Sequence, residues 1–311
     1  PMDLLLVGDV GFGKTEVAMR AAARVVASGK QAAVLCPTTV LAYQHNETWR
    51  ERFEGFPVRL GMLSRFSSAK EARELAESLK KGEIDLVVGT TKLLGRGVSF
   101  ADLGLMIIDE EHRFGVRQKE RIKRLRTEVD VLSLSATPIP RTLSMALSGV
   151  SSFSTIATPP AERLSVRTRI ARFDEDVIRE EILKELGRGG QVFLVHDRVR
   201  SIQAVADQIQ ALVPEARLEI THGQLPPAEL EASLVRFVRR QAEVLVTTSI
   251  IESGVDLPNV NCVLINRADN FGLAQLYQIR GRVGRSWRRG RCVLLVPSDV
   301  GLSRKATRRL R

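Results

Sequence analysis

The chain has 311 residues, of which 44% are hydrophobic and 27% charged, a composition typical of a globular protein long enough for two domains. No apolar run approaches the roughly 20 residues that a membrane-spanning helix needs, and the first residues do not form a signal peptide, so we expect a cytoplasmic protein without membrane contact. The formal net charge of +11 favours a polyanionic partner, with nucleic acid as the first candidate.

A glycine-rich loop near the start of the chain organises the first domain. The apolar residues 4–7 predict a strand, the loop GDVGFGKT spans residues 8–15, and residues 16–28 predict a helix. These three in this order form a cradle in which backbone N–H groups surround a polyphosphate at a helix N-terminus. Lys14 is placed to reach the β- and γ-phosphates, and Thr15 to bind Mg²⁺. The predicted nucleotide-binding residues of the loop are Gly8, Asp9, Val10, Gly11, Phe12, Gly13, Lys14 and Thr15.

Apolar runs alternate with helix-like stretches over the first half of the chain. Strands that are apolar throughout are typical of a parallel sheet with helices on both faces. The alternation stops around residues 157–161, where two adjacent prolines predict an extended connector. The strands predicted after the loop are residues 32–35, 58–63, 84–88, 105–108 and 131–134, with a helix at residues 69–80.

The same alternation restarts after the connector and predicts a second parallel α/β sheet. We therefore expect two domains, 1–157 and 158–311, with a nucleotide cleft between them and no internal sequence repeat. The strands predicted here are residues 166–170, 191–195, 218–220, 244–247, 263–265 and 292–296, and the helices are residues 175–186, 202–212, 228–239 and 273–283.

Two carboxylates follow the strand predicted at residues 105–108. Asp109 and Glu110 are therefore expected at the carboxyl edge of a buried strand, where open α/β sheets bind ligands. Asp109 is the expected Mg²⁺ ligand, and Glu110 is placed to polarise the attacking water. The next strand ends in the same way at Ser135, and the small hydroxyl residues of segment 135–137 predict a link between the acidic site and a bound polymer.

The segment QIRGRVGR, residues 278–285, carries basic residues in the second domain. Arg282 and Arg285 lie three apart on one predicted helical segment, so both guanidiniums can face a phosphoryl group that gains charge, as an arginine finger does. If they complete the site, hydrolysis requires the two domains to close, and a nucleotide cycle becomes motion. The predicted catalytic residues are Lys14, Asp109, Glu110, Arg282 and Arg285.

Motifs along the whole chain resemble those of the superfamily 2 helicases. In order they are GDVGFGKT, PTTVLAYQH, GTTKLL, DEEHRFGV, SATPIPRT, TTSIIESGVDLP and QIRGRVGR. The chain is more closely similar to the translocase module of the bacterial transcription-repair coupling factors, through SRF at residues 64–66, ATPPA at 157–161, HGQ at 222–224 and RADNFGLAQLYQ at 267–278. This resemblance implies two RecA-like parallel-sheet domains in tandem.

The resemblance also implies a function, namely translocation on double-stranded DNA that is driven by ATP and Mg²⁺ and pushes on stalled RNA polymerase. Contacts with RNA polymerase and repair proteins are implied through domains absent from this chain. By motif, Gly254 and Asp256 line the nucleotide site from the second domain. Hydroxyl and amide groups at loop tips suit a grip on phosphates that ignores base sequence. The residues implied to contact DNA are Thr38, Thr39, Thr90, Thr91, Lys92, His222, Gly223, Gln224, Thr247 and Thr248.

Two alternatives stay open. The RecG fork-reversal helicases are similar and remodel branched DNA, but they typically have serine where Phe12 stands and a DEQH-like box where this chain has Glu111. A third hypothesis, from a different class, is a nucleotide-gated DNA-binding module without turnover. Because the chain starts at the nucleotide loop and stops at Arg311, we expect a fragment without the adenine-recognition segment and the translocation hairpin of these families.

Overall fold

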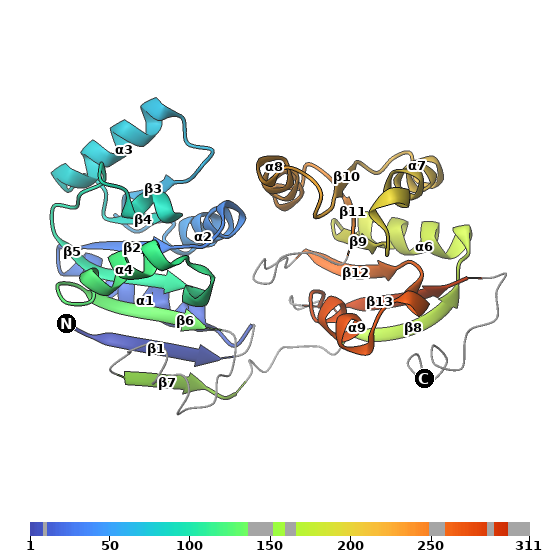
Figure 1. Ribbon diagram of the computed structural model, residues 1–311, viewed down its shortest axis with the longest axis horizontal. Coiled ribbons are helices and arrows are strands. Elements are labelled where there is room, and N and C mark those ends of the chain that lie inside the picture. Colours follow the sequence, from blue (N-terminus) through green and yellow to red (C-terminus); the bar gives the residue numbers. More distant parts are fainter. Residues whose placement is uncertain (9–10, 136–151, 159–165, 249–258, 285–288, 298–311) are drawn as a thin grey trace. The chain divides into compact units, whose positions relative to one another are not determined.

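The computed structural model describes residues 1–8, 11–135, 152–158, 166–248, 259–284 and 289–297 (Figure 1). The chain divides into two compact units, Pro1–Pro160 and Ala161–Arg311, and the predicted boundary at residues 157 and 158 lies near this division. Each unit is built on one parallel sheet with helices packed against it. The predicted fold class, two parallel α/β sheets in tandem, is confirmed.

The first unit contains a seven-stranded sheet in which all described pairs of strands are parallel. Its inner strands β2 and β4 are fully buried and, apart from Gln31, carry no polar side chain, as expected for a sheet covered on both faces. Because the strands are parallel, their carboxyl ends lie at the same edge of the sheet. The strands are β1 (Asp3–Gly8), β2 (Gln31–Leu35), β3 (Leu60–Leu63), β4 (Leu86–Gly89), β5 (Leu103–Asp109), β6 (Asp130–Ser135) and β7 (Ser152–Ile156), in the spatial order β3-β4-β2-β5-β6-β1-β7.

Among the described residues of this unit, four helices cover the sheet, two on each face. They are α1 (Lys14–Ala27), α2 (Thr39–Arg52), α3 (Ala69–Lys81) and α4 (Val116–Leu125), with short 3-10 turns η1 (Thr91–Leu94) and η2 (Glu111–Arg113). Ala18 of α1 and Trp49 of α2 belong to one core cluster, whereas Leu79 of α3 and Ile122 of α4 belong to another. Strand residues alternate between the two clusters, since successive side chains of a strand point to opposite faces.

The second unit repeats this plan with a six-stranded parallel sheet. Phe193 of the sheet stacks on Phe237 of a covering helix with ring centroids 5.6 Å apart. The strands are β8 (Arg167–Arg172), β9 (Gln191–Val195), β10 (Leu218–Thr221), β11 (Val244–Thr247), β12 (Val260–Ile265) and β13 (Arg291–Val296), in the order β10-β11-β9-β12-β13-β8. The helices are α6 (Glu175–Leu186), α7 (Ile202–Leu212), α8 (Pro227–Val238) and α9 (Leu273–Arg280), with η3 (Val199–Ser201) and η4 (Ala268–Asn270).

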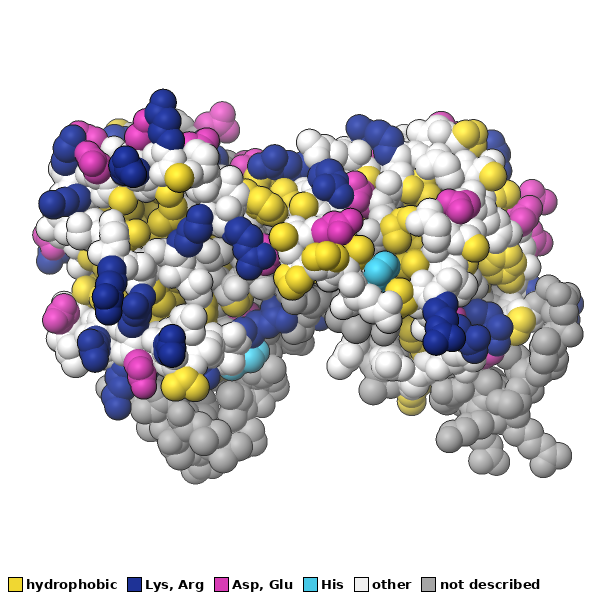
Figure 2. Space-filling view, turned by 45° about the horizontal axis from the view of Figure 1, so that its top comes forward, with side chains coloured by type: hydrophobic (Ala, Val, Ile, Leu, Met, Phe, Trp, Pro, Cys, Tyr) yellow, Lys and Arg dark blue, Asp and Glu magenta, His cyan; other side chains and the backbone are white. Residues whose placement is uncertain are grey.

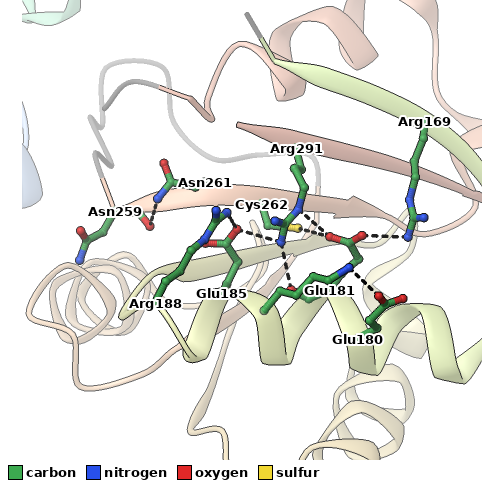
Figure 3. A network of polar contacts seen from close by, with 10 residues as sticks. Arg169, Glu180, Glu181, Glu185, Arg188, Asn259, Asn261, Cys262 and Arg291 are labelled. Carbon is green, nitrogen blue, oxygen red and sulfur yellow. Dashed lines mark hydrogen bonds and ion pairs between the residues drawn. The ribbon is translucent and has the colours of Figure 1, made fainter. Parts of the chain in front are cut away.

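A buried ion-pair network ties helix α6 to strands β8 and β13 (Figure 3). The Glu185 side chain is fully buried and Glu181 is 5% exposed. Arg291 lies between them, with Nη2 3.0 Å from Glu185 Oε1 and Nε 2.7 Å from Glu181 Oε2, although the Nε–H is not aimed at that oxygen. Arg169 pairs with Glu181 at 2.9 Å, and Arg188 pairs with Glu185. One arginine therefore neutralises parts of two buried carboxylates.

Two elements differ from their prediction. Strand β7 was not expected, because its residues SFSTI are largely polar and mostly exposed at the sheet edge, unlike the apolar inner strands. The last predicted helix, residues 273–283, ends at Arg280. Glycine destabilises a helix interior, and Gly284 adopts a φ of +71°, which L side chains rarely adopt, so the chain leaves the helix here.

A turn of similar structure lies at the end of a central strand in each unit. DEEHRFGVRQ, residues 109–118, and NRADNFGLAQ, residues 266–275, each follow a buried central strand, β5 or β12. Both contain a residue with positive φ, a 3-10 turn, a Phe-Gly pair and the start of a helix. The positive φ values are +49° at Glu110 and +55° at Arg267. This turn is therefore a feature of the strand end in both units.

Candidate nucleotide-binding site

The site lies at the carboxyl edge of the first sheet. The glycine-rich loop follows β1, Asp109 closes β5 and Ser135 closes β6. Because β5, β6 and β1 are neighbours in the sheet, these three strand ends lie side by side. The structure thus brings together the residues that the sequence predicted for phosphate and metal from segments about 100 residues apart in the chain.

The loop before α1 requires glycine for geometric reasons. Gly13 is the N-cap of α1 with φ +86°, a left-handed conformation that disfavours L side chains. A Cβ on Gly8 would approach Ile156 Cβ to 3.3 Å, so Gly8 also permits the close pairing of β1 with β7. Lys14 Nζ donates a hydrogen bond to the Gly8 carbonyl oxygen at 2.7 Å, and Thr15 is half-buried in the first turn of α1. Asp9 and Val10 lie outside the described residues.

Asp109 ends strand β5 with its side chain 14% exposed. Its Oδ2 lies 2.9 Å from Nε2 of His45, a residue on helix α2. His45 was not among the predicted site residues, although it closes the motif PTTVLAYQH. The contact joins residues 64 positions apart, so the sequence gives no local signal of it.

Glu110 follows Asp109 and is 12% exposed at its side chain. Burial and the neighbouring Asp109 raise the pKa of the Glu110 carboxyl, while the positive charges of His112 and Lys14 act in the opposite direction. Glu110 Oε2 lies 3.3 Å from His112 Nδ1. A carboxylate with a raised pKa beside a second carboxylate and a lysine suits proton transfer.

Glu111, the third carboxylate of this segment, faces the protein instead. Its Oε2 accepts hydrogen bonds from Arg126 Nη2 at 2.6 Å and from Ser133 Oγ at 2.7 Å. Arg126 Nη1 in turn lies 3.3 Å from Asp3 Oδ2 at the start of β1. Glu111 therefore holds η2, α4, β6 and β1 together and has a structural environment, whereas Asp109 and Glu110 lie at the sheet edge.

Metal binding depends on few protein ligands here. Among the described residues, no three His, Cys, Asp or Glu side chains group as a metal cage. Mg²⁺ usually takes one or two carboxylates and completes its shell with waters and substrate phosphates. The hydroxyl of Thr15 and the carboxylate of Asp109 fit that mode of binding.

The predicted DNA contacts of the first unit differ in exposure. Thr91 and Lys92 are exposed in η1, whereas Thr39 is 3% and Thr90 8% exposed. Thr38 is the N-cap of α2, where its side chain accepts a hydrogen bond from the Leu41 N–H at 3.3 Å. The exposed pair is therefore the more accessible part of this set.

The predicted DNA contacts of the second unit include or adjoin polar atoms that have no hydrogen-bond partner among the described residues. Thr221 Oγ1, His222 Nδ1 and Thr248 Oγ1 are buried and have no hydrogen-bond partner among the described residues. Thr221 and Thr247 are paired in register at the carboxyl ends of β10 and β11. Gly223 and Gln224 beside them are exposed. Buried polar atoms without partners are costly unless a ligand or water satisfies them.

A second cluster at the same edge was missed by the sequence analysis. His196 follows β9, and its Nε2 lies 2.7 Å from Ser201 Oγ, while Asn266 Nδ2 lies 3.4 Å from its Nδ1. Burial lowers the pKa of His196, although the charge of Asp197 opposes the shift. Single histidine residues carry no local sequence signal of such a cluster.

Of the remaining predicted site residues, the structure describes Arg282. Arg282 is half-buried in the turn after α9, where its N–H donates to the Ile279 carbonyl oxygen at 3.0 Å. Arg282 therefore lies beyond the end of α9, whereas the sequence predicted it on a helical segment. The predicted residues Gly254, Asp256 and Arg285, and residues 136 and 137, lie outside the described residues.

No helix in the described part of the chain is both long and apolar enough to cross a membrane. Figure 2 shows Lys and Arg side chains over both units on the face in view, and they do not gather in a single strip there. The charge surplus predicted to attract a polyanion is thus widely distributed on this face.

Comparison with known families decides the class of protein. The DEAD/DEAH box helicase family matches residues 1–146, and the helicase conserved C-terminal domain matches residues 175–286. The chain is a helicase-like enzyme of superfamily 2. The prediction of a helicase-type enzyme is confirmed, and so is nucleotide binding as the property of such domains.

Three relatives show which members of this class the chain is similar to. The transcription-repair-coupling factors of Escherichia coli and Haemophilus influenzae are 54% and 53% identical to it over 309 residues, 99% of this chain and 27% of each relative. The structure of RecG bound to a three-way DNA junction has a TM-score of 0.74 and 37% identity, covering 100% of this chain and 41% of that one. The predicted resemblance to the coupling factors is confirmed, and this helicase spans about a quarter of their length.

Proposed function

We propose that this helicase is the ATP-driven motor of a transcription-repair coupling factor, which moves along double-stranded DNA and displaces stalled RNA polymerase through other parts of the whole protein. The observation that carries the proposal is the convergence of Lys14, Thr15, Asp109 and Glu110 at one sheet edge, in a chain 54% identical to a coupling factor. RNA polymerase and repair proteins are proposed as partners of the whole protein.

The proposed nucleotide is ATP, held with Mg²⁺. Lys14 leaves the Gly8 carbonyl and binds the β- and γ-phosphates, while the N–H groups at the start of α1 bind the same anion. Thr15 and Asp109 hold the metal ion, which when bound neutralises charge on the phosphates. Glu110 takes a proton from the attacking water, a role that its raised pKa supports.

The second unit contributes basic residues in this proposal. Arg282 and Arg285 stabilise the charge that develops on the transferred phosphoryl group, and Gly254 and Asp256 contact the nucleotide. These roles are carried over from the family motifs and stay predictions.

DNA is proposed to lie on the predicted phosphate contacts of each unit. In the second unit, phosphate oxygens would accept hydrogen bonds from the hydroxyls of Thr221 and Thr248, which have no partner among the described residues. In the first unit, Thr91 and Lys92 are exposed in η1. Arg121 of α4 donates a hydrogen bond to the carbonyl oxygen of Leu94 in the same turn. The exposed basic residues of α4 are Arg117, Lys119, Arg121, Lys123 and Arg124.

A RecG-like activity on branched DNA is the second candidate. The RecG structure covers the whole chain, which supports this candidate, but its 37% identity is lower than the 54% of a coupling factor. A nucleotide-gated binding module without turnover is the third, and the acidic pair at Asp109 and Glu110 argues against it.

The proposal is tested by phosphate release from ATP with Mg²⁺, measured without DNA, with linear duplex DNA and with a three-way junction. We expect linear duplex to raise the rate, with the effect falling as salt rises because phosphate contacts release counterions. Stimulation by the junction alone would favour the RecG-like candidate. Absence of hydrolysis with every DNA, despite nucleotide binding, would favour the binding module.

A further inference from the structure

The Asp109 carboxylate, at the end of strand β5, forms a hydrogen bond with a side chain of helix α2. His45 lies in α2, and its Nε2 is 2.9 Å from Asp109 Oδ2. Both side chains are nearly buried, with 10% of His45 and 14% of Asp109 exposed. Among the described residues, this is the one side-chain hydrogen bond that Asp109 makes. A buried hydrogen bond to a charged group is strong enough to select one orientation of the carboxylate.

The other nitrogen of the His45 ring fixes which atom carries the proton. Trp49, one helical turn further along α2, has Nε1 3.3 Å from His45 Nδ1. An indole N–H can only donate, so Nδ1 accepts and carries no proton. The ring proton therefore lies on Nε2 and points at Asp109 Oδ2. Trp49 itself is fully buried and stacks on Phe53 with centroids 6.0 Å apart, so its N–H is rigidly held.

We propose that His45 is a positioning residue that orients Asp109 for Mg²⁺, and that Trp49 fixes the tautomer that lets it do so. This rests on the proposed function, in which Asp109 binds the metal ion. A partner that donates to one carboxylate oxygen leaves the other oxygen free to bind the ion in a single orientation. His45 thus acts through Asp109 and does not touch the nucleotide.

Helix α2 also connects the proposed metal site with residues that are predicted to contact DNA. Helix α2 starts at Thr39, directly after Thr38, and both residues are predicted to contact DNA. His45 follows about 10 Å further along the same helix, given a rise of about 1.5 Å per residue. The helix that orients Asp109 is therefore the one whose first turn is predicted to meet phosphate.

The test uses three variants of the whole 311-residue chain. His45→Leu removes the donor at similar volume. His45→Gln places an amide N–H near the former Nε2 and keeps a donor. Trp49→Phe keeps a buried ring and removes the indole N–H, so the His45 proton is no longer fixed on Nε2.

The measured quantity is the affinity for a fluorescent ATP analogue, titrated over a range of MgCl₂ concentrations and again in EDTA. We expect His45→Leu to need about 10-fold more Mg²⁺ for half of the metal-dependent gain in affinity. His45→Gln should stay close to the unmodified chain, and Trp49→Phe should fall between the two. Affinity in EDTA should be the same in all four proteins, because the glycine-rich loop is intact.

Several outcomes overturn the inference and are distinct from failure of the proposed function. If the unmodified chain shows no gain in affinity with Mg²⁺, the proposed metal role of Asp109 is wrong. If that gain is present and His45→Leu needs no more Mg²⁺ than the unmodified chain, His45 does not position Asp109. Equal losses in His45→Leu and His45→Gln, accompanied by equal falls in melting temperature, would show a purely structural residue. If His45→Leu does not fold, Trp49→Phe and His45→Gln carry the comparison.

Discussion

Glu110→Gln should lower the rate of ATP hydrolysis by about 10²–10⁴-fold, the usual contribution of a general base. The amide keeps the size of the side chain and leaves Asp109, Thr15 and the glycine-rich loop unchanged, so binding of Mg²⁺ and ATP should persist. Phosphate release under single-turnover conditions, together with binding of a fluorescent ATP analogue, separates the chemical step from binding.

The matched control is Glu111→Gln, the same substitution one residue along the chain. Glu111 accepts hydrogen bonds from Arg126 and Ser133 and faces the protein, so its amide variant should hydrolyse ATP at nearly the unmodified rate while losing stability. Wild-type turnover in Glu110→Gln, or an equal loss in both variants, would contradict the role proposed for Glu110.

Arg291→Met should destabilise the second unit by about 3–5 kcal/mol, because it removes the cation between buried Glu181 and Glu185 and leaves them with the more exposed Arg169 and Arg188. Hydrogen exchange measured by mass spectrometry reports this on β12 and β13. Protection there should fall by roughly 10²- to 4 × 10³-fold, since 1.4 kcal/mol corresponds to a factor of ten. Peptides from β5 in the first unit serve as the internal reference.

Arg169→Met is the matched control for that change. Arg169 pairs with the same Glu181, but its side chain is 46% exposed, and exposed pairs contribute about 0–1 kcal/mol. It should therefore change protection by less than about tenfold. Similar effects of the two substitutions would mean that burial of the network (Figure 3) does not determine its contribution to stability.

The inner strands and the phosphate loop could be predicted from the sequence because both depend on local patterns. Residues 32–35 and 192–195 are apolar throughout, and they lie in β2 and β9. The loop GDVGFGKT carries its glycines at the positions that the turn into α1 requires. The edge strand β7 could not be predicted, since its exposed face removes the apolar pattern.

The candidate site could be predicted only in part. Asp109 and Glu110 follow an apolar run, so their place at a strand end is visible in the sequence. The partners of these residues come from distant segments. His45 reaches Asp109 across 64 residues, and Arg126 reaches Asp3 across 123. Neither periodicity nor motif spacing encodes such pairs, because they depend on how the helices pack against the sheet.

The central claim is that Lys14 binds the phosphates of ATP at the start of α1. Its most direct test is the affinity of the 311-residue chain for an ATP analogue in Mg²⁺, compared with Lys14→Ala and with Lys70→Ala, whose side chain is 85% exposed on α3. Loss of a hydrogen bond to a charged group costs about 1.5–3 kcal/mol, so Lys14→Ala should bind roughly 10- to 100-fold more weakly, whereas Lys70→Ala should match the unmodified chain. Equal affinity in all three proteins would contradict the account.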